Sequence, residues 1–254
     1  MAPLLVRMGR GDQQSGSAGE FEGVVRRNAG KAVDHIVATL PERARESFLA
    51  LIAQPPADVP EPERPEPGSA PLPEAAPQLI GVCGQPRAGK DFMIDQLIKH
   101  YGGIARMNYS DAVIAEANEA LRAAGVERLI HEGNKSDPLP RRFLQDLGLG
   151  RREEEGASYW ADQVRRRAGG LMQGSRLVIV AGLRTESDLE PIRRLGGEVW
   201  RVERPGNTYK AEHPIEAKIN ELPVDRVILN DVEGDPGALF EKARAALETP
   251  REAQ

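Results

Sequence analysis

The chain has 254 residues, a formal net charge of −5 and a pI of about 5.6. This length suits one sizeable α/β domain with an appendage, and the acidic balance counts against a surface built for general nucleic-acid binding. No apolar run approaches the roughly 18 residues that a membrane span requires, and the lone Cys83 excludes an intrachain disulfide. We therefore expect a cytoplasmic protein with no membrane partner.

The first 78 residues are predicted to lie outside the main domain. Residues 1–20 are polar and rich in Gly, Ser and Gln, which is typical of a disordered N-terminus. Within 21–53, apolar residues recur at helical spacing on both sides of Pro41, which predicts a small module of two short helices. Its apolar stripe must pack against the main domain, a second copy or another partner. Residues 54–78 contain nine prolines and predict a semi-rigid linker.

The main domain is predicted to span 79–248, with a short tail at 249–254. Short apolar runs indicate strands at 79–83, 104–109, 177–182, 197–202 and 226–230. Helical spacing indicates helices at 89–100, 111–124, 139–147, 158–171, 185–195 and 235–247. This alternation predicts an α/β fold of the P-loop NTPase and kinase type, a parallel sheet of about five strands with helices on both faces and a small N-terminal helical arm.

A phosphate-binding loop is predicted directly after the first strand. The pattern G-x-x-x-x-G-K, between a buried strand and a helix, lets backbone N–H groups curl round a phosphate at a helix N-terminus. Its lysine can reach the β- and γ-phosphates of a nucleotide. A chance match in a chain rich in Ala and Gly is the alternative. The predicted nucleotide-binding residues are Gly84, Gln85, Pro86, Arg87, Ala88, Gly89, Lys90 and Asp91.

Further candidates follow the predicted strands. Asp91 occupies the position at which such loops usually carry Ser or Thr, and its carboxylate is a candidate Mg²⁺ ligand. Asp111 follows the second strand and could cap a helix or act on an acceptor hydroxyl, or both. Arg184 leaves the third strand as a candidate phosphate clamp, with an ion pair to Glu186 or Asp188 as the alternative. Asn230 ends the fifth strand, beside the expected base pocket.

Cations cluster between Lys135 and Arg152 and again at 165–167. Phosphoryl transfer depends on positioning and on neutralising developing charge, for which mobile arginines are well suited. For any single arginine, a solvated surface position is the simpler interpretation. For the cluster as a whole, we favour a lid or an acceptor-binding role.

Taken together, the ordered motifs resemble the phage-type deoxynucleoside monophosphate kinases, P-loop kinases related to adenylate kinase and animal phosphomevalonate kinase. The matching strings are G-Q-P-R-A-G-K-D at 84–91, S-D at 110–111, R-R-F-L-Q-D-L-G at 141–148, Y-W at 159–160, G-L-R-T-E-S-D at 182–188, G-G-E-V-W-R-V-E-R-P-G at 196–206, H-P-I-E at 213–216 and V-D-R-V-I-L-N-D at 224–231. The resemblance implies ATP and Mg²⁺, with Lys90 contacting the β- and γ-phosphates and Arg142, Arg151 and Arg184 as phosphate ligands.

The resemblance leaves the acceptor open. Gly182 stands where family members commonly carry an Asp, and Phe92 follows the loop as in the phosphomevalonate branch. One related group phosphorylates 5-hydroxymethyluracil within phage DNA, and the helical arm and linker suit a macromolecular substrate of that kind. Free deoxynucleoside monophosphates are the alternative acceptor. If the chain is phage-encoded, it would work in the host cytoplasm.

A nucleotide-dependent switch ATPase is the alternative from another functional class, and Gly182 is its best support. Many kinases of this class form dimers, so a homodimer is an open alternative to a monomer.

Overall fold

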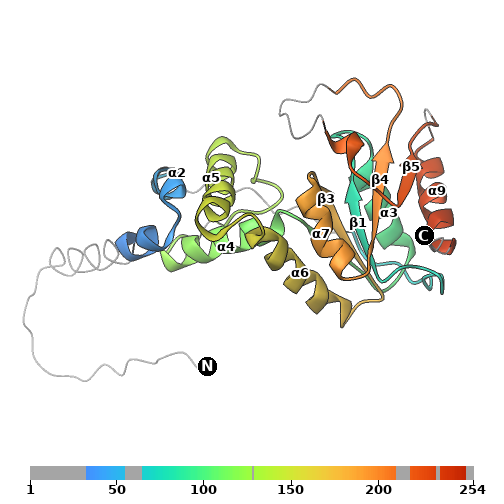
Figure 1. Cartoon of the computed structure of the whole chain (residues 1–254), viewed down its shortest axis with the longest axis horizontal. Helices are drawn as coiled ribbons and strands as arrows, with labels where there is room; N and C mark the ends of the chain where they lie inside the picture. The colour runs from blue at the N-terminus through green and yellow to red at the C-terminus, as the bar shows by residue number, and fades with distance from the viewer. Residues whose placement is uncertain (1–32, 55–64, 128, 210–217, 233–234, 250–254) are drawn as a thin grey trace, which may run out of the picture.

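The computed structural model describes residues 33–54, 65–127, 129–209, 218–232 and 235–249. The predictions for 1–32, 55–64 and 250–254 fall outside these residues. Five parallel strands form one sheet in the order β2-β3-β1-β4-β5 (Figure 1). They are β1 (Leu79–Cys83), β2 (Ile104–Asn108), β3 (Leu177–Leu183), β4 (Glu198–Glu203) and β5 (Arg226–Leu229). The predicted α/β fold with a parallel sheet is therefore confirmed.

Helices cover both faces of the sheet. Side chains of α3 and α9 share one buried cluster with Ile80, Ile179 and Trp200 of the sheet. Those of α4, α6 and α7 share the other with Val178 and Val180. The helices are α2 (Glu42–Ile52), α3 (Lys90–His100), α4 (Asp111–Ala123), α5 (Pro138–Glu155), α6 (Tyr159–Met172), α7 (Glu186–Arg194) and α9 (Pro236–Glu248), with a short 3₁₀ turn η1 (Ile219–Glu221).

The central strand β1 explains why its sequence is apolar throughout. All five of its residues are buried, because helices pack on both of its faces and β3 and β4 pair with its two edges. After β1 the chain forms β2 and β3 on one side of β1, and it then crosses to form β4 and β5 on the other side. In such sheets ligands bind outside the carboxyl ends of the strands, near this switch point. The loop after β1 lies at that edge.

Helix α5 is longer than its sequence pattern predicted. It continues through Gly148 and Gly150 to Glu155, whereas the glycines suggested an end near residue 147. A Cβ added at Gly150 would lie 2.4 Å from the Cβ of Pro41. Gly148 accepts a hydrogen bond from the indole Nε1 of Trp160 at 2.8 Å. The close approach of Pro41 therefore explains the glycine at position 150 inside a helix.

The N-terminal helical segment packs on this main domain. Residues 33–39 are helical, and α2 follows after Pro41. Phe48 of α2 is fully buried against Phe143 of α5, with ring centroids 5.4 Å apart. Leu40, Ala44, Phe48 and Leu51 belong to the same buried cluster as β3 and α6. The apolar stripe thus finds its partner within the chain.

The second half of the proline-rich stretch also contacts the domain. Gly68 donates its N–H to the carbonyl of Ile98 at 2.8 Å, and Ala70 donates to His100 at 3.1 Å. A Cβ at Gly68 would lie 2.3 Å from the His100 carbonyl oxygen, so only glycine allows this approach. From Gly68 to Ala76, this part of the predicted linker is packed against the domain rather than extended as a free spacer.

In the described part of the chain, none of the helices has both the length and the apolar character that a membrane span needs.

Candidate active site

The loop between β1 and α3 has the backbone of a tight phosphate cradle. Gly84, Arg87 and Gly89 all have positive φ, at 136°, 64° and 102°. A Cβ added at Gly84 would lie 2.3 Å from the carbonyl oxygen of Val202 in the neighbouring strand. Glycine is therefore required at Gly84 both by conformation and by space. Lys90 begins α3, whose N-terminus faces the loop.

Side chains anchor three carbonyls of this loop. The Nζ of Lys90 donates to the Gln85 carbonyl at 2.8 Å. The amide Nδ2 of Asn207 donates to Pro86 at 2.9 Å, and that of Asn230 donates to Ala88 at 3.0 Å. Asn207 follows β4 and Asn230 follows β5, so two separate segments, together with Lys90 of the loop itself, fix the loop's shape before a ligand binds. Such preorganisation reduces the ordering cost of binding.

Asn230 was expected beside a base pocket, and in the structure it contacts the loop after β1. Its amide lies against the loop, 2.8 Å from the position of a Cβ added at Gly89. Asn207 was not predicted as a site residue. Its sequence neighbours Arg204-Pro205-Gly206 indicate only a turn, and no local pattern shows that the turn brings the next asparagine to Pro86.

We predict that Asn207→Ala and Asn230→Ala each weaken ATP binding by roughly 2- to 10-fold, the equivalent of one neutral hydrogen bond. The dissociation constant from a nucleotide titration is the measurement. Asn220→Ala, at an exposed asparagine on η1, is the matched control. Wild-type affinity in both loop variants would contradict the anchoring role.

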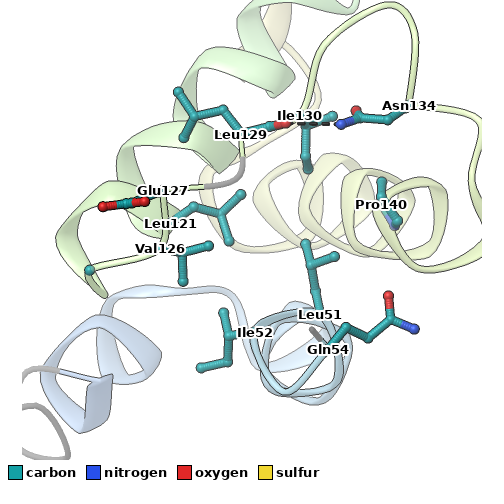
Figure 2. Close-up of a pocket in the computed structure, with 11 residues that line it drawn as sticks. Leu51, Ile52, Gln54, Leu121, Val126, Glu127, Leu129, Ile130, Asn134 and Pro140 are labelled. Carbon is teal, nitrogen blue, oxygen red and sulfur yellow. Dashed lines mark hydrogen bonds between the residues drawn. The ribbon is translucent and has the colours of Figure 1, made fainter. Parts of the chain in front are cut away.

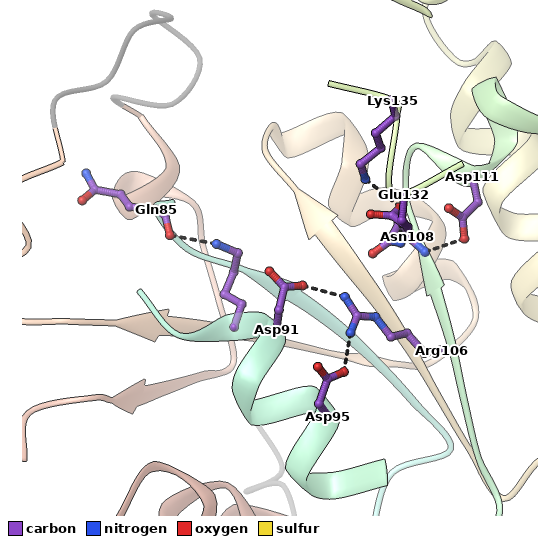
Figure 3. A network of polar contacts seen from close by, with 9 residues as sticks. Gln85, Asp91, Asp95, Arg106, Asn108, Asp111, Glu132 and Lys135 are labelled. Atoms are coloured by element: carbon purple, nitrogen blue, oxygen red, sulfur yellow. Dashed lines mark hydrogen bonds and ion pairs between the residues drawn. The ribbon is translucent and has the colours of Figure 1, made fainter. Parts of the chain in front are cut away.

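Asp91 is held by an arginine from the neighbouring strand β2. Arg106 donates to the Oδ1 of Asp91 at 2.6 Å and to Asp95, one turn further along α3, at 2.7 Å (Figure 3). The Asp91 side chain is 73% exposed, and among the described residues nothing contacts its other oxygen. Asp91 can therefore offer one carboxylate oxygen to a cation beside the loop.

A second polar group lies at the carboxyl end of β2. The Asp111 Oδ2 accepts the backbone N–H of Asn108 at 2.8 Å, which closes the turn into α4. The Asn108 side chain donates to the Oε1 of Glu132 at 3.0 Å, and Lys135 contacts the same oxygen at 2.7 Å (Figure 3). The structure thus places Asp111 at the predicted edge of the sheet. Its carboxylate does not cap α4, because it accepts the N–H of Asn108, which precedes the helix.

Glu132 and Lys135 belong to a loop that two buried asparagines hold in shape. Asn118 of α4 makes two hydrogen bonds to the backbone of Ile130, at 2.8 and 2.7 Å. Asn134 accepts from the His131 N–H at 2.9 Å and donates to the Leu129 carbonyl at 3.0 Å. Beneath this loop lies a largely apolar pocket of about 300 Å³ between α2, α4 and α5 (Figure 2). The pocket supplies few polar groups, so it is a poor candidate for catalysis.

Arg142 and Arg151 are used elsewhere in the fold. Arg142 pairs with Glu46 of α2 at 3.1 Å. Arg151 pairs with Glu116 of α4 at 2.6 Å and donates to the Thr39 carbonyl at 3.2 Å. Their partners lie on the N-terminal helices and on α4, so the structure does not bring these two predicted phosphate ligands to the loop. Within the cation cluster, Arg142 and Arg151 help to hold the N-terminal segment.

Arg184 lies at the predicted edge, at the exit of β3, and its side chain is exposed. The carboxylate of Asp188 accepts the backbone N–H groups of Arg184 and Thr185, at 2.9 and 3.0 Å, in a capping box that starts α7. Gly182 sits in a bulge at which Cys83 pairs with Leu183, and its φ of 84° explains a glycine there. Asp188 therefore serves the helix start.

Cys83 lies in an environment that disfavours the reactive thiolate. Its side chain is fully buried at the end of β1. Burial raises the pKa of the thiol to about 11, against the smaller opposing effects of Arg201 and Lys90. The thiol is therefore protonated at neutral pH, and it acts as a small packing residue.

Among the described residues, no group of three or more His, Cys, Asp or Glu side chains is arranged to hold a metal ion. Comparison with protein-family models and with curated proteins found no match for this chain. The candidate function is therefore inferred from the residues of the site.

Proposed function

We propose that the protein is an ATP-dependent phosphotransferase. The observation that carries this proposal is the loop 84–91, in which positive φ at both glycines and three anchored carbonyls form a cradle beside a helix N-terminus. Its curvature and its lysine suit the triphosphate of a nucleotide. Lys90 would neutralise charge on the transferring group.

Mg²⁺ fits this arrangement through a single protein ligand. The open oxygen of Asp91 would hold the ion, and waters and phosphate oxygens would complete its shell, as is usual for magnesium in such sites. When bound, the ion lowers the charge of the β- and γ-phosphates. Arg184, at the same edge, is a further candidate to stabilise the transferring group.

The charges around the end of β2 favour a neutral hydroxyl as the acceptor. Asp91 and Asp95 pair with Arg106, and Glu132 pairs with Lys135, so both cations are already engaged by carboxylates. Asp111 adds a further carboxylate. The attacking oxygen of a free monophosphate would bring its own negative charge next to these carboxylates, whereas an attacking hydroxyl is neutral. We therefore favour the hydroxymethyl group of 5-hydroxymethyluracil in DNA over a deoxynucleoside monophosphate.

Incubation with γ-labelled ATP tests the proposal. The protein is offered duplex DNA containing 5-hydroxymethyluracil, the same duplex containing thymine, a set of deoxynucleoside monophosphates, or no acceptor. We expect label on the hydroxymethyl DNA alone. Label on a monophosphate would establish the alternative acceptor. Free phosphate without a labelled acceptor would indicate the switch ATPase and would overturn the kinase assignment.

A further inference from the structure

A carboxylate that no sequence motif indicated is the best placed to act on the acceptor. Arg106 and Asn108 are two residues apart on β2, and the alternation of the strand puts both on the face that α3 covers, together with Ile104. Arg106 reaches Asp91, next to Lys90, while Asn108 reaches Glu132. One face of β2 therefore contacts both Asp91, at the end of the nucleotide loop, and Glu132.

The distance across the sheet suits a transfer reaction. Strands β2 and β1 are separated only by β3, so their carboxyl ends lie two strand spacings, or about 10 Å, apart. A phosphoryl group bound at the loop after β1 and an alcohol held near the end of β2 fit within that span. Glu132 lies at this end of β2, where Asn108 binds its carboxylate (Figure 3).

Within the described part of the chain, hydrogen bonds fix one oxygen of the Glu132 carboxylate and leave the other open. Asn108 and Lys135 both donate to Oε1, at 3.0 and 2.7 Å. Among the described residues no hydrogen bond is made to Oε2, and the side chain is 44% exposed. The bonds from Asn118 and Asn134 hold the loop that carries it. Asp111 likewise uses one oxygen, to close the turn after β2, but it is half-buried whereas Glu132 is exposed.

We infer that Glu132 is the catalytic carboxylate that orients and deprotonates the acceptor hydroxyl, an assignment that rests on the proposed kinase function. The acceptor oxygen forms a bond to the γ-phosphorus, and the bond from that phosphorus to the β–γ bridging oxygen breaks, which releases ADP. The hydroxyl proton passes to Oε2 of Glu132 and then to water. Lys135 and Asn108 are positioning residues that fix the carboxylate.

The test is phosphate transfer to duplex DNA containing 5-hydroxymethyluracil by the full-length Glu132→Gln and Glu132→Ala variants. We expect kcat to fall roughly 10²- to 10⁴-fold in both, the usual contribution of a general base, with the ATP dissociation constant unchanged. Added formate should restore part of the activity of Glu132→Ala, because a small carboxylate can replace the missing one. A merely structural role would give no such rescue. Glu127→Gln, at an exposed carboxylate of the same loop, is the matched control.

The outcomes separate this assignment from the proposed function. Wild-type rates in Glu132→Gln, beside an active wild-type protein, would overturn the role of Glu132 alone. A loss of activity in Glu132→Ala that formate does not restore, accompanied by weaker ATP binding, would also overturn it. A wild-type protein that binds ATP but transfers no phosphate to any acceptor would overturn the kinase proposal, and the Glu132 assignment with it.

Discussion

Lys90→Ala is expected to lower phosphotransfer by at least about 10³-fold, comparable to the loss of other cations that stabilise a transferring phosphoryl group. Lys90 begins α3 and bonds the Gln85 carbonyl within the loop, and on the proposed function its ammonium would neutralise charge on the γ-phosphate. Lys90→Arg should also be impaired, because a planar guanidinium does not replace a compact ammonium in a tight cradle. Steady-state kinetics with γ-labelled ATP is the measurement.

The stability of the Lys90→Ala protein should change little. The residue is only partly buried, and its bond to the Gln85 carbonyl joins a flexible side chain to the loop that carries it. We expect the free energy of unfolding to stay within about 1 kcal/mol of wild type. Lys99→Ala, at an exposed lysine near the end of the same helix, serves as the control for activity. Normal kinetics in Lys90→Ala would refute the catalytic assignment.

Phe48→Ala is expected to have the largest effect on stability, a loss of about 3–5 kcal/mol in the free energy of unfolding. Phe48 is fully buried, and its ring packs on Phe143 of α5 with centroids 5.4 Å apart. Removing the ring leaves a cavity between α2 and α5 that neighbouring groups would fill only in part. Denaturant titration followed by tryptophan fluorescence measures the change, because Trp160 belongs to the same buried cluster.

Leu49→Ala is the matched control for Phe48→Ala. Leu49 is the next residue on α2, and its side chain is 45% exposed. Its truncation should change the free energy of unfolding by no more than about 0.5 kcal/mol. If Phe48→Ala lowered the free energy of unfolding equally little, α2 would behave as a separate arm. That result would contradict the packing of α2 on α5.

The sequence predicted the sheet closely because its strands are short apolar runs with clear boundaries. The five strands lie within one residue or so of the expected ranges, from Leu79 at the start of β1 to Leu229 at the end of β5. The spacing and the type of the apolar residues indicate such strands from the local sequence alone. The end of α5 was misplaced for a tertiary reason, since Gly150 lies beneath Pro41 of a segment over 100 residues away in sequence.

The loop could be predicted because the residues that define it are contiguous in the sequence. Gly84 and Gly89 are needed for backbone conformation, and Lys90 follows directly. The residues that support the loop could not be predicted, because Asn207 and Asn230 reach it from the ends of β4 and β5. Only the three-dimensional order of the strands brings those ends together.

Charged residues misled the sequence reasoning most. Clustering of arginines in 141–152 suggested phosphate ligands, yet Arg142 and Arg151 pair with Glu46 and Glu116. The carboxylates that complete these pairs lie on other helices, so no local spacing shows them. Glu132 was overlooked for the same reason, because its partner Asn108 lies 24 residues earlier in the chain.

Isothermal titration of the purified protein with ATP and Mg²⁺ tests the central claim most directly. The anchored loop predicts saturable binding at one site, with a dissociation constant of about 1 mM or tighter, as is typical for enzymes of this kind. Lys90→Ala should weaken that binding. Titration at high protein concentration that yields no binding heat at several temperatures would contradict a nucleotide site between β1 and α3.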